Sequence, residues 1–248
     1  MRLTARRWAM EIRPQRGGRI TSLRLDGDEL LDQGIGVDQP TEEGFVAAGA
    51  FGWDEMVPNV EPTDTLPDHG EAWRVPWEVM SLDSGSAVMR ASGRIVPWEL
   101  TRTIELGDEL TVSYGYRNVG STPHLAYWCA HPLFKYQAEM KIGLAGPGLS
   151  TLTLPGEPEG ESKKVFLPRG SFDRARLRWT SGPGIELSWD ASATPYVGVW
   201  MCNGDLGGYR QLAIEPATGG NDGPDPSAPP PSLEPGETLE WGLRIRAL

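Results

Sequence analysis

The sequence predicts an all-β protein built from antiparallel sheets. Thirty-one glycines and 22 prolines interrupt the 248-residue chain so often that no apolar pattern at helical spacing continues for long. Between these breaks, many short runs alternate apolar and polar residues, which is typical of half-buried strands. A chain of this length can bury a large core, and we expect one domain over residues 1–248.

In the first half of the chain, strands are predicted at residues 8–13, 18–25, 73–79, 98–106 and 110–117. The Gly107-Asp108 turn between the last two predicts a β-hairpin. Run 73–79 reads as a half-buried strand, and Pro76 places it at a sheet edge or a bulge. Arg102 lies on the otherwise apolar face of 98–106, so it is either a rim arginine or a ligand contact.

In the second half, strands are predicted at residues 124–131, 185–189, 196–202, 211–215 and 239–245. We expect Pro132 to end the first of these just beyond His131. A run of basic residues within 162–178, including Lys163 and Lys164, is interpreted as a solvated face. Residues 216–235 are rich in Pro, Gly, Asp and Ser, which predicts a long surface loop or a lid.

Composition excludes several classes of partner and chemistry. The net charge of -11 would repel nucleic acid and anionic membranes. No apolar run is long enough to span a bilayer, so a cytoplasmic location is expected. The two cysteines imply no disulfide framework. A phosphate-binding glycine loop, a nucleophile elbow and a Cys-x-x-Cys pair are all missing from the sequence.

Three ionisable residues are candidates for chemistry, because each lies where a strand meets a turn or loop. His131 is one of only three histidines and can move a proton near neutral pH. Glu215 closes the 211–215 strand immediately before the Pro-rich loop. His69 lies on a turn beside Asp68, without a second His or Cys at ligand spacing, so no metal site is expected. Taken singly, each also fits a structural role.

Carbohydrate is the ligand class that the aromatic residues favour. Ten tryptophans offer flat faces for the C–H edge of a pyranose, although most tryptophans are core residues. The paired carboxylates of 51–58 stand next to an indole. We assign candidate sugar contacts to Trp53, Asp54, Trp73 and Arg102.

Six short stretches follow one another along the chain: Gly17-Gly18-Arg19-Ile20-Thr21-Ser22-Leu23, Gly52-Trp53-Asp54-Glu55-Met56-Val57-Pro58, Asp68-His69-Gly70, Tyr116-Arg117-Asn118, His131-Pro132-Leu133-Phe134 and Glu215-Pro216-Ala217-Thr218-Gly219. Their order and spacing resemble the aldose 1-epimerase (galactose mutarotase-like) family over nearly the whole chain. The resemblance implies a large antiparallel β-sandwich, the supersandwich of that family, with an open sugar cleft. It also implies an isomerase that interconverts the α and β anomers of a free aldose without a cofactor.

Carried over by position, the resemblance makes Glu215 the general base, His131 the general acid and His69 the second histidine of the site. A carboxylate can take the proton of the anomeric hydroxyl while an imidazolium protonates the ring oxygen. The hexose-6-phosphate branch of the family resembles the stretch around His69 more, but it carries an arginine where Trp73 stands. A neutral sugar is therefore favoured as the small-molecule partner, and a hexose-phosphate mutarotase and a non-catalytic carbohydrate-binding or regulatory protein remain as alternatives. The sequence does not define an oligomeric state.

Overall fold

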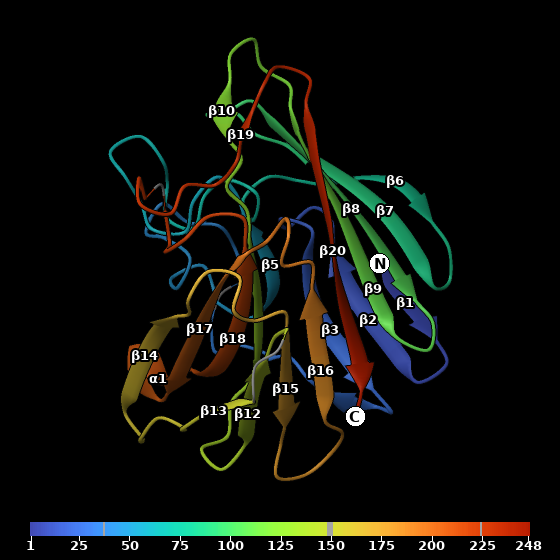
Figure 1. Cartoon of the computed structure of the whole chain (residues 1–248). Coiled ribbons are helices and arrows are strands. Elements are labelled where there is room, and N and C mark those ends of the chain that lie inside the picture. The colour runs from blue at the N-terminus through green and yellow to red at the C-terminus, as the bar shows by residue number, and fades with distance from the viewer. Residues whose placement is uncertain (37, 148–150, 224) are drawn as a thin grey trace.

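Two large antiparallel sheets pack face to face in the computed structural model, which describes residues 1–36, 38–147, 151–223 and 225–248 (Figure 1). The first sheet contains, in spatial order, β1 (Arg2–Ala5), β2 (Trp8–Arg13), β3 (Arg19–Leu25), β5 (Gly52–Met56), β11 (Cys129–Lys135), β18 (Arg210–Ala217), β17 (Tyr196–Asn203) and β14 (Glu161–Phe166), with β4 (Asp28–Glu29) paired to β3. The second contains β13 (Leu152–Leu154), β12 (Lys141–Ala145), β15 (Arg174–Arg178), β16 (Ile185–Trp189), β20 (Thr238–Ala247), β9 (Leu110–Asn118), β8 (Trp98–Leu106), β7 (Ser86–Ser92) and β6 (Glu78–Leu82).

Two short elements lie outside these sheets. Strand β10 (His124–Leu125) pairs with β19 (Ser232–Leu233), and a single turn, α1 (Asp205–Gly208), follows β17. Among the described residues, no helix is long and apolar enough to cross a membrane. The predicted all-β fold with large antiparallel sheets is therefore confirmed.

The core lies between the two sheets. Strands β8 and β9 alternate buried and more exposed residues along their lengths, so that one face of each turns inward. Trp53 from the first sheet and Trp98 and Tyr114 from the second belong to one continuous hydrophobic cluster. Such a cluster holds the first sheet rigidly from behind, which leaves its other face free to carry a site.

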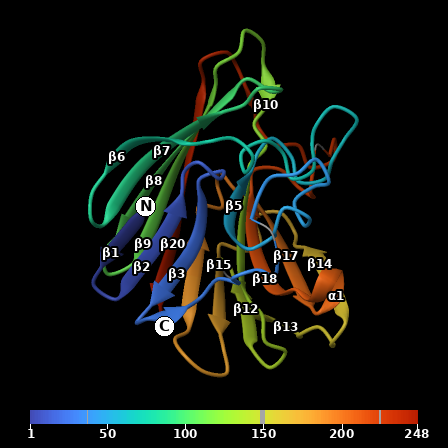
Figure 2. The same cartoon turned by 180° about the vertical axis from the view of Figure 1, so that it is seen from behind.

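A second, smaller hydrophobic cluster lies on that other face of the first sheet. Met56, Cys129 and Leu133 contribute to it from the strands, while Phe45 and Trp73 come from the loops before and after β5. Figure 2 shows these loops gathered at one end of the sheet. They cover part of the outer face and frame the rest.

Several predicted elements are confirmed. The strands at 8–13 and 18–25 are β2 and β3, and the hairpin around Gly107-Asp108 is β8 and β9. The last predicted strand is β20, which lies between β16 and β9. Most of the predicted loop at 216–235 is irregular, apart from the end of β18 and the two residues of β19, while residue 224 lies outside the described residues.

The predicted strand at 73–79 is wrong. Arg74 and Val75 donate backbone hydrogen bonds to the Glu71 carbonyl, so this segment turns and only β6, from Glu78, is extended. Trp73 packs into the smaller cluster and Trp77 into the core. The alternation of apolar residues in 73–79 therefore does not come from a strand. It arises because Trp73 and Trp77 are buried in two different hydrophobic clusters.

The predicted strand at 124–131 and its end at Pro132 also need correction. The structure divides this segment into β10 and β11, and β11 continues past Pro132 to Lys135. Between β11 and β18 the pairing is interrupted from the Cys129–Ala217 pair to the Leu133–Ala213 pair. Proline has no N–H to donate, and it is accommodated inside a central strand because the ladder is open at that point.

Candidate active site

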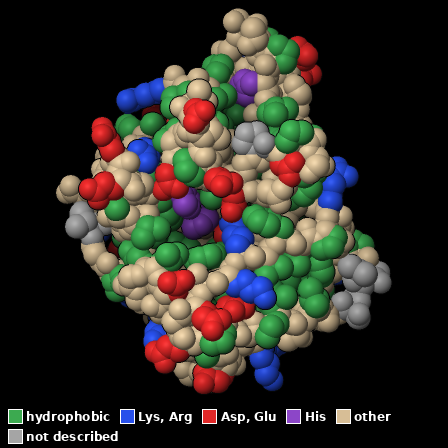
Figure 3. Space-filling model, turned by 90° about the vertical axis from the view of Figure 1, so that its left-hand side faces the viewer, with side chains coloured by type: hydrophobic (Ala, Val, Ile, Leu, Met, Phe, Trp, Pro, Cys, Tyr) green, Lys and Arg blue, Asp and Glu red, His purple; other side chains and the backbone are tan. Residues whose placement is uncertain are grey.

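A cavity of about 400 Å³ lies over the outer face of the first sheet. Figure 3 shows this hollow with histidine side chains at its base and acidic side chains around it. The ionisable residues that line it are Glu61, Asp68, His69, His131, Lys164, Glu215 and Asp222. The three residues predicted to carry chemistry, which are far apart in the sequence, therefore share one cavity.

Strand register places His131 opposite Glu215. The pairs Cys129–Ala217 and Leu133–Ala213 flank them with the same offset, so the two side chains project from one face of neighbouring strands. His131 Nε2 lies 3.7 Å from Glu215 Oε1. Both side chains are deeply buried, with exposed fractions of 7% for His131 and 1% for Glu215. The pair is thus held by two neighbouring inner strands of the sheet.

Lys164 lies against the same carboxylate. Its ammonium contacts Glu215 Oε2 and lies 2.8 Å from Asp222 Oδ1, and its side chain is only 17% exposed. The interpretation of this lysine as part of a solvated face is therefore wrong. Gly198 of β17 is the strand partner of Glu215, and its missing side chain leaves space for Lys164 to cross.

His69 reaches the cavity from a tight turn. Its backbone is left-handed, with a φ of 57°, and its N–H donates to the Val60 carbonyl. The next residue, Gly70, must be glycine because an added Cβ would lie 2.3 Å from the Val57 carbonyl oxygen. His69 Nδ1 hydrogen-bonds to Asp68 Oδ1 at 2.7 Å. The turn and the hydrogen bond to Asp68 thus hold the imidazole at the cavity.

Phe45 joins the two histidines. Its ring stacks on His69 with a centroid distance of 4.5 Å and meets His131 edge-on at 5.3 Å. The Phe45 N–H donates to the second oxygen of Asp68 at 2.6 Å. The centroids of the two imidazoles are 5.5 Å apart.

Burial moves the proton affinities of the facing pair in opposite directions. It raises the pKa of Glu215 from its ordinary value of 4.5, while the neighbouring Lys164 acts to lower it. It lowers the pKa of His131 well below 6.5, and the positive charges of Lys164 and Arg19 act in the same direction. For Asp68, burial acts upward, but the hydrogen bond to His69 leaves its pKa below 3.8.

Apolar side chains form the floor and walls beside the ionisable row. Leu133, two residues after His131 on the same face of β11, lines the cavity together with Trp200 of β17. Tyr209 and Leu206 complete this side of the cavity. One end of the cavity is therefore rich in charge, and the floor next to it is apolar.

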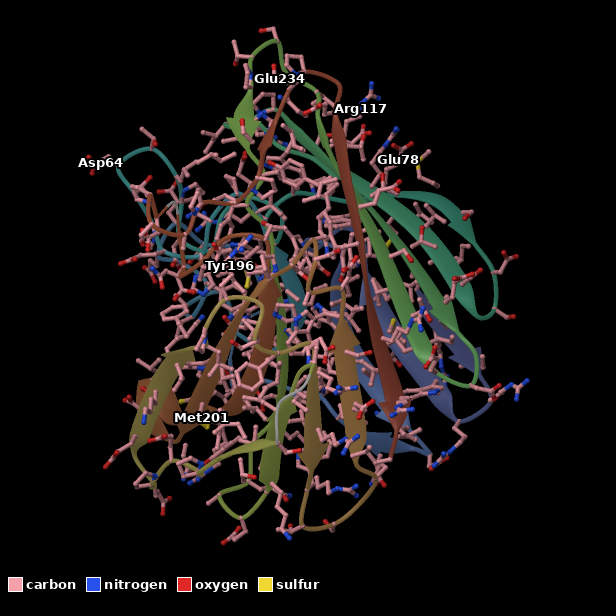
Figure 4. The ribbon with its side chains drawn as sticks, viewed as in Figure 1. Asp64, Glu78, Arg117, Tyr196, Met201 and Glu234 are labelled. Carbon is pink, nitrogen blue, oxygen red and sulfur yellow. The ribbon has the colours of Figure 1, made fainter. Side chains whose placement is uncertain are left out.

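A smaller cavity of about 210 Å³ adjoins the first and shares Glu215 and Asp222 with it. Tyr196, at the start of β17, lines this cavity, whereas Met201 of the same strand belongs to the core; Figure 4 labels both. The Glu215 carboxylate thus lies at the junction of two cavities.

The four predicted sugar contacts are not among the residues that line the main cavity. Trp53 lies in the core, on the opposite face of β5. Asp54 is the strand partner of His131, but Arg19 binds its carboxylate at 2.8 Å. Trp73 is fully buried behind Phe45. Arg102 is fully buried between the sheets, 3.0 Å from Glu55. None of the four side chains therefore lies where it can contact a ligand in this cavity.

Sequence reasoning missed Lys164, Asp222 and Trp200. A usable signal existed for Trp200, because the predicted strand 196–202 puts it on the same face as Gly198, opposite the core. Lys164 was missed because it belongs to a run of basic residues, and the sequence does not show which residue of such a run is buried. Asp222 comes from an irregular loop, where no periodicity indicates the direction of a side chain.

Among the described residues, no group of three or more His, Cys, Asp or Glu side chains is arranged to hold a metal ion.

Solved structures of galactose mutarotase-like proteins share this fold. One from Lactobacillus casei ATCC 334 matches with a TM-score of 0.78 and 15% sequence identity, covering 100% of this chain and 99% of that one. A provisionally assigned aldose 1-epimerase from Escherichia coli K12 matches with a TM-score of 0.76 and 16% identity, covering 100% and 98%. No protein-family model and no curated protein sequence matches the chain. The chain therefore has the galactose mutarotase-like fold, and the predicted β-sandwich of that type is confirmed.

Proposed function

We propose that the protein is an aldose 1-epimerase-like isomerase that interconverts the α and β anomers of a free, uncharged aldose. The observation that carries the proposal is the buried Glu215–His131 pair, whose facing atoms are 3.7 Å apart at the base of a cavity of small-molecule size. The anomeric hydroxyl and the ring oxygen of a pyranose are bonded to one carbon. An acceptor and a donor this close together can therefore serve both oxygens.

The chemistry follows from these positions. Glu215 takes the proton of the anomeric hydroxyl while His131 protonates the ring oxygen, so the ring opens without either full charge accumulating. The aldehyde then rotates about its bond to the next carbon, and the same two groups close the ring on its other face. Each positioned group contributes on the order of 10²- to 10⁴-fold. His69, held by Asp68, faces the same space and is assigned to bind and orient the sugar hydroxyls.

The shape and charge of the cavity support an uncharged sugar. Leu133 and Trp200 line the cavity and offer apolar surface for the C–H face of a pyranose. The lining contains four carboxylates and one lysine, and two of those carboxylates already pair with Lys164. A sugar phosphate would meet net negative charge there, which disfavours the hexose-phosphate alternative.

Saturation-transfer NMR on a panel of aldoses tests the proposal. D-Glucose, D-galactose, D-xylose and L-arabinose are compared with glucose 6-phosphate, each with and without protein. Exchange between the anomeric signals of at least one uncharged sugar is expected to accelerate, with glucose 6-phosphate responding less. Acceleration that is greatest for the phosphosugar would favour the hexose-phosphate alternative.

Tryptophan fluorescence on the same panel separates catalysis from binding alone. A sugar that is bound next to Trp200 is expected to change the emission of the wild-type protein, and Trp200→Ala should remove most of that change. If a sugar changes the emission but no anomer exchange accelerates, the protein is a carbohydrate-binding protein and not an epimerase.

A further inference from the structure

The ammonium of Lys164 contacts only one of the two oxygens of the Glu215 carboxylate. Oε2 contacts Lys164 Nζ, while Oε1 has no hydrogen-bond partner among the described residues. That free oxygen is the one that faces His131 Nε2. A buried carboxylate oxygen without a partner is costly, and it is typical of an atom that a ligand completes.

We propose that Lys164 is a positioning residue that makes Glu215 the base of the pair: it keeps the carboxylate ionised in a buried site and presents only Oε1 to the substrate. The role in turnover rests on the proposed epimerase function. The electrostatic role can be measured without it.

The charges that face Glu215 explain why a cation is needed. His131 and Cys129 approach it from β11, Asp222 from the loop after β18 and His69 from the turn before β6, while the Tyr127 hydroxyl lies nearby. Burial and the negative charge of Asp222 both favour a protonated Glu215. Lys164 opposes them from β14 through direct contact.

Without the ammonium of Lys164, we expect the one proton shared by Glu215 and His131 to reside on Glu215, which could then not act as the base. A Glu215 that is protonated beside a neutral His131 contains as many protons as an ionised Glu215 beside an imidazolium, but the acid and the base are exchanged. The charge of Lys164 disfavours the imidazolium of His131, but its direct contact is with Glu215, so its larger effect is to stabilise the ionised carboxylate of the second arrangement. It therefore sets the direction of proton transfer while touching neither the sugar nor the transferred proton.

The lysine itself is held in place. Asp222 Oδ1 lies 2.8 Å from its ammonium, and the Asp222 carbonyl accepts backbone hydrogen bonds from Val60 and Glu61, each at 2.7 Å. Asp222 is thus fixed between two loops rather than free at the surface. The contact differs in this respect from an exposed ion pair, which would contribute little.

Gly198 makes the contact possible. A Cβ added there would lie 3.1 Å from Glu215 Oε2 and 3.1 Å from Lys164 Cε, closer than these atoms tolerate comfortably. The backbone of Gly198 is not in the left-handed region, so alanine fits its conformation. Gly198→Ala therefore disturbs the contact between the lysine and the carboxylate without removing a charge.

The test titrates Glu215 directly by ¹³C NMR of its side-chain carboxyl, with the signal assigned by its loss in Glu215→Gln. We expect Lys164→Met to raise the pKa of Glu215 by roughly 1–3 units, the usual effect of one contacting charge. Lys164→Arg should restore most of the wild-type titration, and Gly198→Ala should give a smaller rise in the same direction. Lys163→Met is the matched control, because that side chain is exposed and should leave the titration unchanged.

An unchanged Glu215 titration in both Lys164→Met and Gly198→Ala overturns the inference, whatever the activity. Gly198→Ala also keeps the test decisive if Lys164→Met fails to fold. If the titration shifts as expected but wild-type protein accelerates no anomer exchange, the proposed function fails and the role of the lysine stands. Where exchange is measurable, the acidic limb of kcat/KM should move upward with the Glu215 pKa in Lys164→Met.

Discussion

At the scale of single residues, the same burial acts oppositely on the two members of the proposed pair. It raises the pKa of Glu215 and lowers the pKa of His131. Groups this close titrate as a pair, and the apparent values belong to both. A reversible reaction on two faces of one sugar requires each group to give up its proton and to regain it.

We therefore expect a narrow, bell-shaped pH profile of kcat/KM with its maximum on the acidic side of neutrality. Glu215 must be ionised, so the rate falls as pH drops through a pKa displaced above 4.5. His131 must carry a proton, so the rate falls as pH rises through a pKa displaced below 6.5. Stopped-flow polarimetry across pH 4–9 measures both limbs.

The basic limb should disappear from the profile of His131→Asn along with most of the activity. A basic limb that persists in His131→Asn but is lost in His69→Asn would assign the proton donor to His69 instead. A flat profile from pH 5 to 8 would contradict both assignments.

The sequence indicated the three ionisable residues but not their ligand-facing neighbours. Glu215 and His131 could be selected because each ends or interrupts an apolar run, and a family resemblance connected them. Trp53 and Trp73 were chosen for their chemistry alone, but Trp53 points into the core and Trp73 is buried behind Phe45. Which face of a strand a tryptophan occupies depends on the partner sheet, and the local sequence does not contain that information.

At the scale of elements, the site depends on one open stretch of ladder between two central strands. Pro132 of β11 and Pro216 of β18 lie on either side of the His131–Glu215 pair, and neither can donate a backbone hydrogen bond. The sequence predicted the strands but misread Pro132 as an end. Its actual place could not be inferred because it depends on a pairing between residues about 80 positions apart.

Hydrogen bonds of Thr218 hold the first residues of the loop after β18 in place, and their contribution can be tested. The buried Thr218 hydroxyl accepts the Trp128 N–H at 2.8 Å and donates to the Ala126 carbonyl at 2.7 Å. Thr218→Val keeps the shape but loses both bonds, so we expect a loss of roughly 1–3 kcal/mol in the free energy of unfolding. Hydrogen exchange should accelerate at the Trp128 amide and along 218–222.

Thr238→Val, in an exposed position on β20, is the control and should change neither measurement. Full protection of the Trp128 amide in Thr218→Val would show that this hydroxyl does not fasten the loop.

At the scale of the whole molecule, a buried ion pair joins the two sheets behind the site. Glu55 of the first sheet accepts hydrogen bonds from Arg102 at 3.0 Å, from Tyr114 at 2.9 Å and from Trp128 at 2.9 Å. Burial nevertheless raises the pKa of Glu55 from 4.5 to about 7. The folded state therefore binds this proton more tightly than the unfolded chain. The resulting stabilisation is present in full below pH 4.5 and is lost as pH rises through about 7.

Replacing Arg102 should make the effect of pH on stability measurable. Arg102→Met leaves a buried carboxylate without its counter-charge, and we expect it to cost about 3–5 kcal/mol at pH 8. The cost should be smaller at pH 5.5, where Glu55 can stay protonated. Urea unfolding at both values measures the difference.

Arg90→Met is the matched control, because Arg90 pairs with Glu78 at the surface, where solvent screens the pair, and should leave the free energy of unfolding nearly unchanged at either pH. Equal losses at pH 5.5 and pH 8 in Arg102→Met would contradict the assigned role of Glu55.

The general architecture was the most predictable level of the molecule. Glycine and proline spacing, alternation and the Gly107-Asp108 hairpin sufficed for an all-β fold with antiparallel sheets. The pairing of Arg102 with Glu55 was not predictable, because it joins different sheets through the core. A lone arginine on an apolar face indicated only that a partner must exist.

The central claim is that Glu215 and His131 act together on an anomeric centre, and one NMR series tests it most directly. Saturation transfer on the best uncharged aldose is measured for wild type, Glu215→Gln, His131→Asn and the double variant, with far-UV circular dichroism confirming that each is folded. We predict that each single variant loses at least about 10²-fold in exchange rate. The double variant is expected to be little worse than the poorer single one, because the effects of groups that act as a unit are not additive. Wild-type exchange rates in both single variants would contradict the joint action of Glu215 and His131.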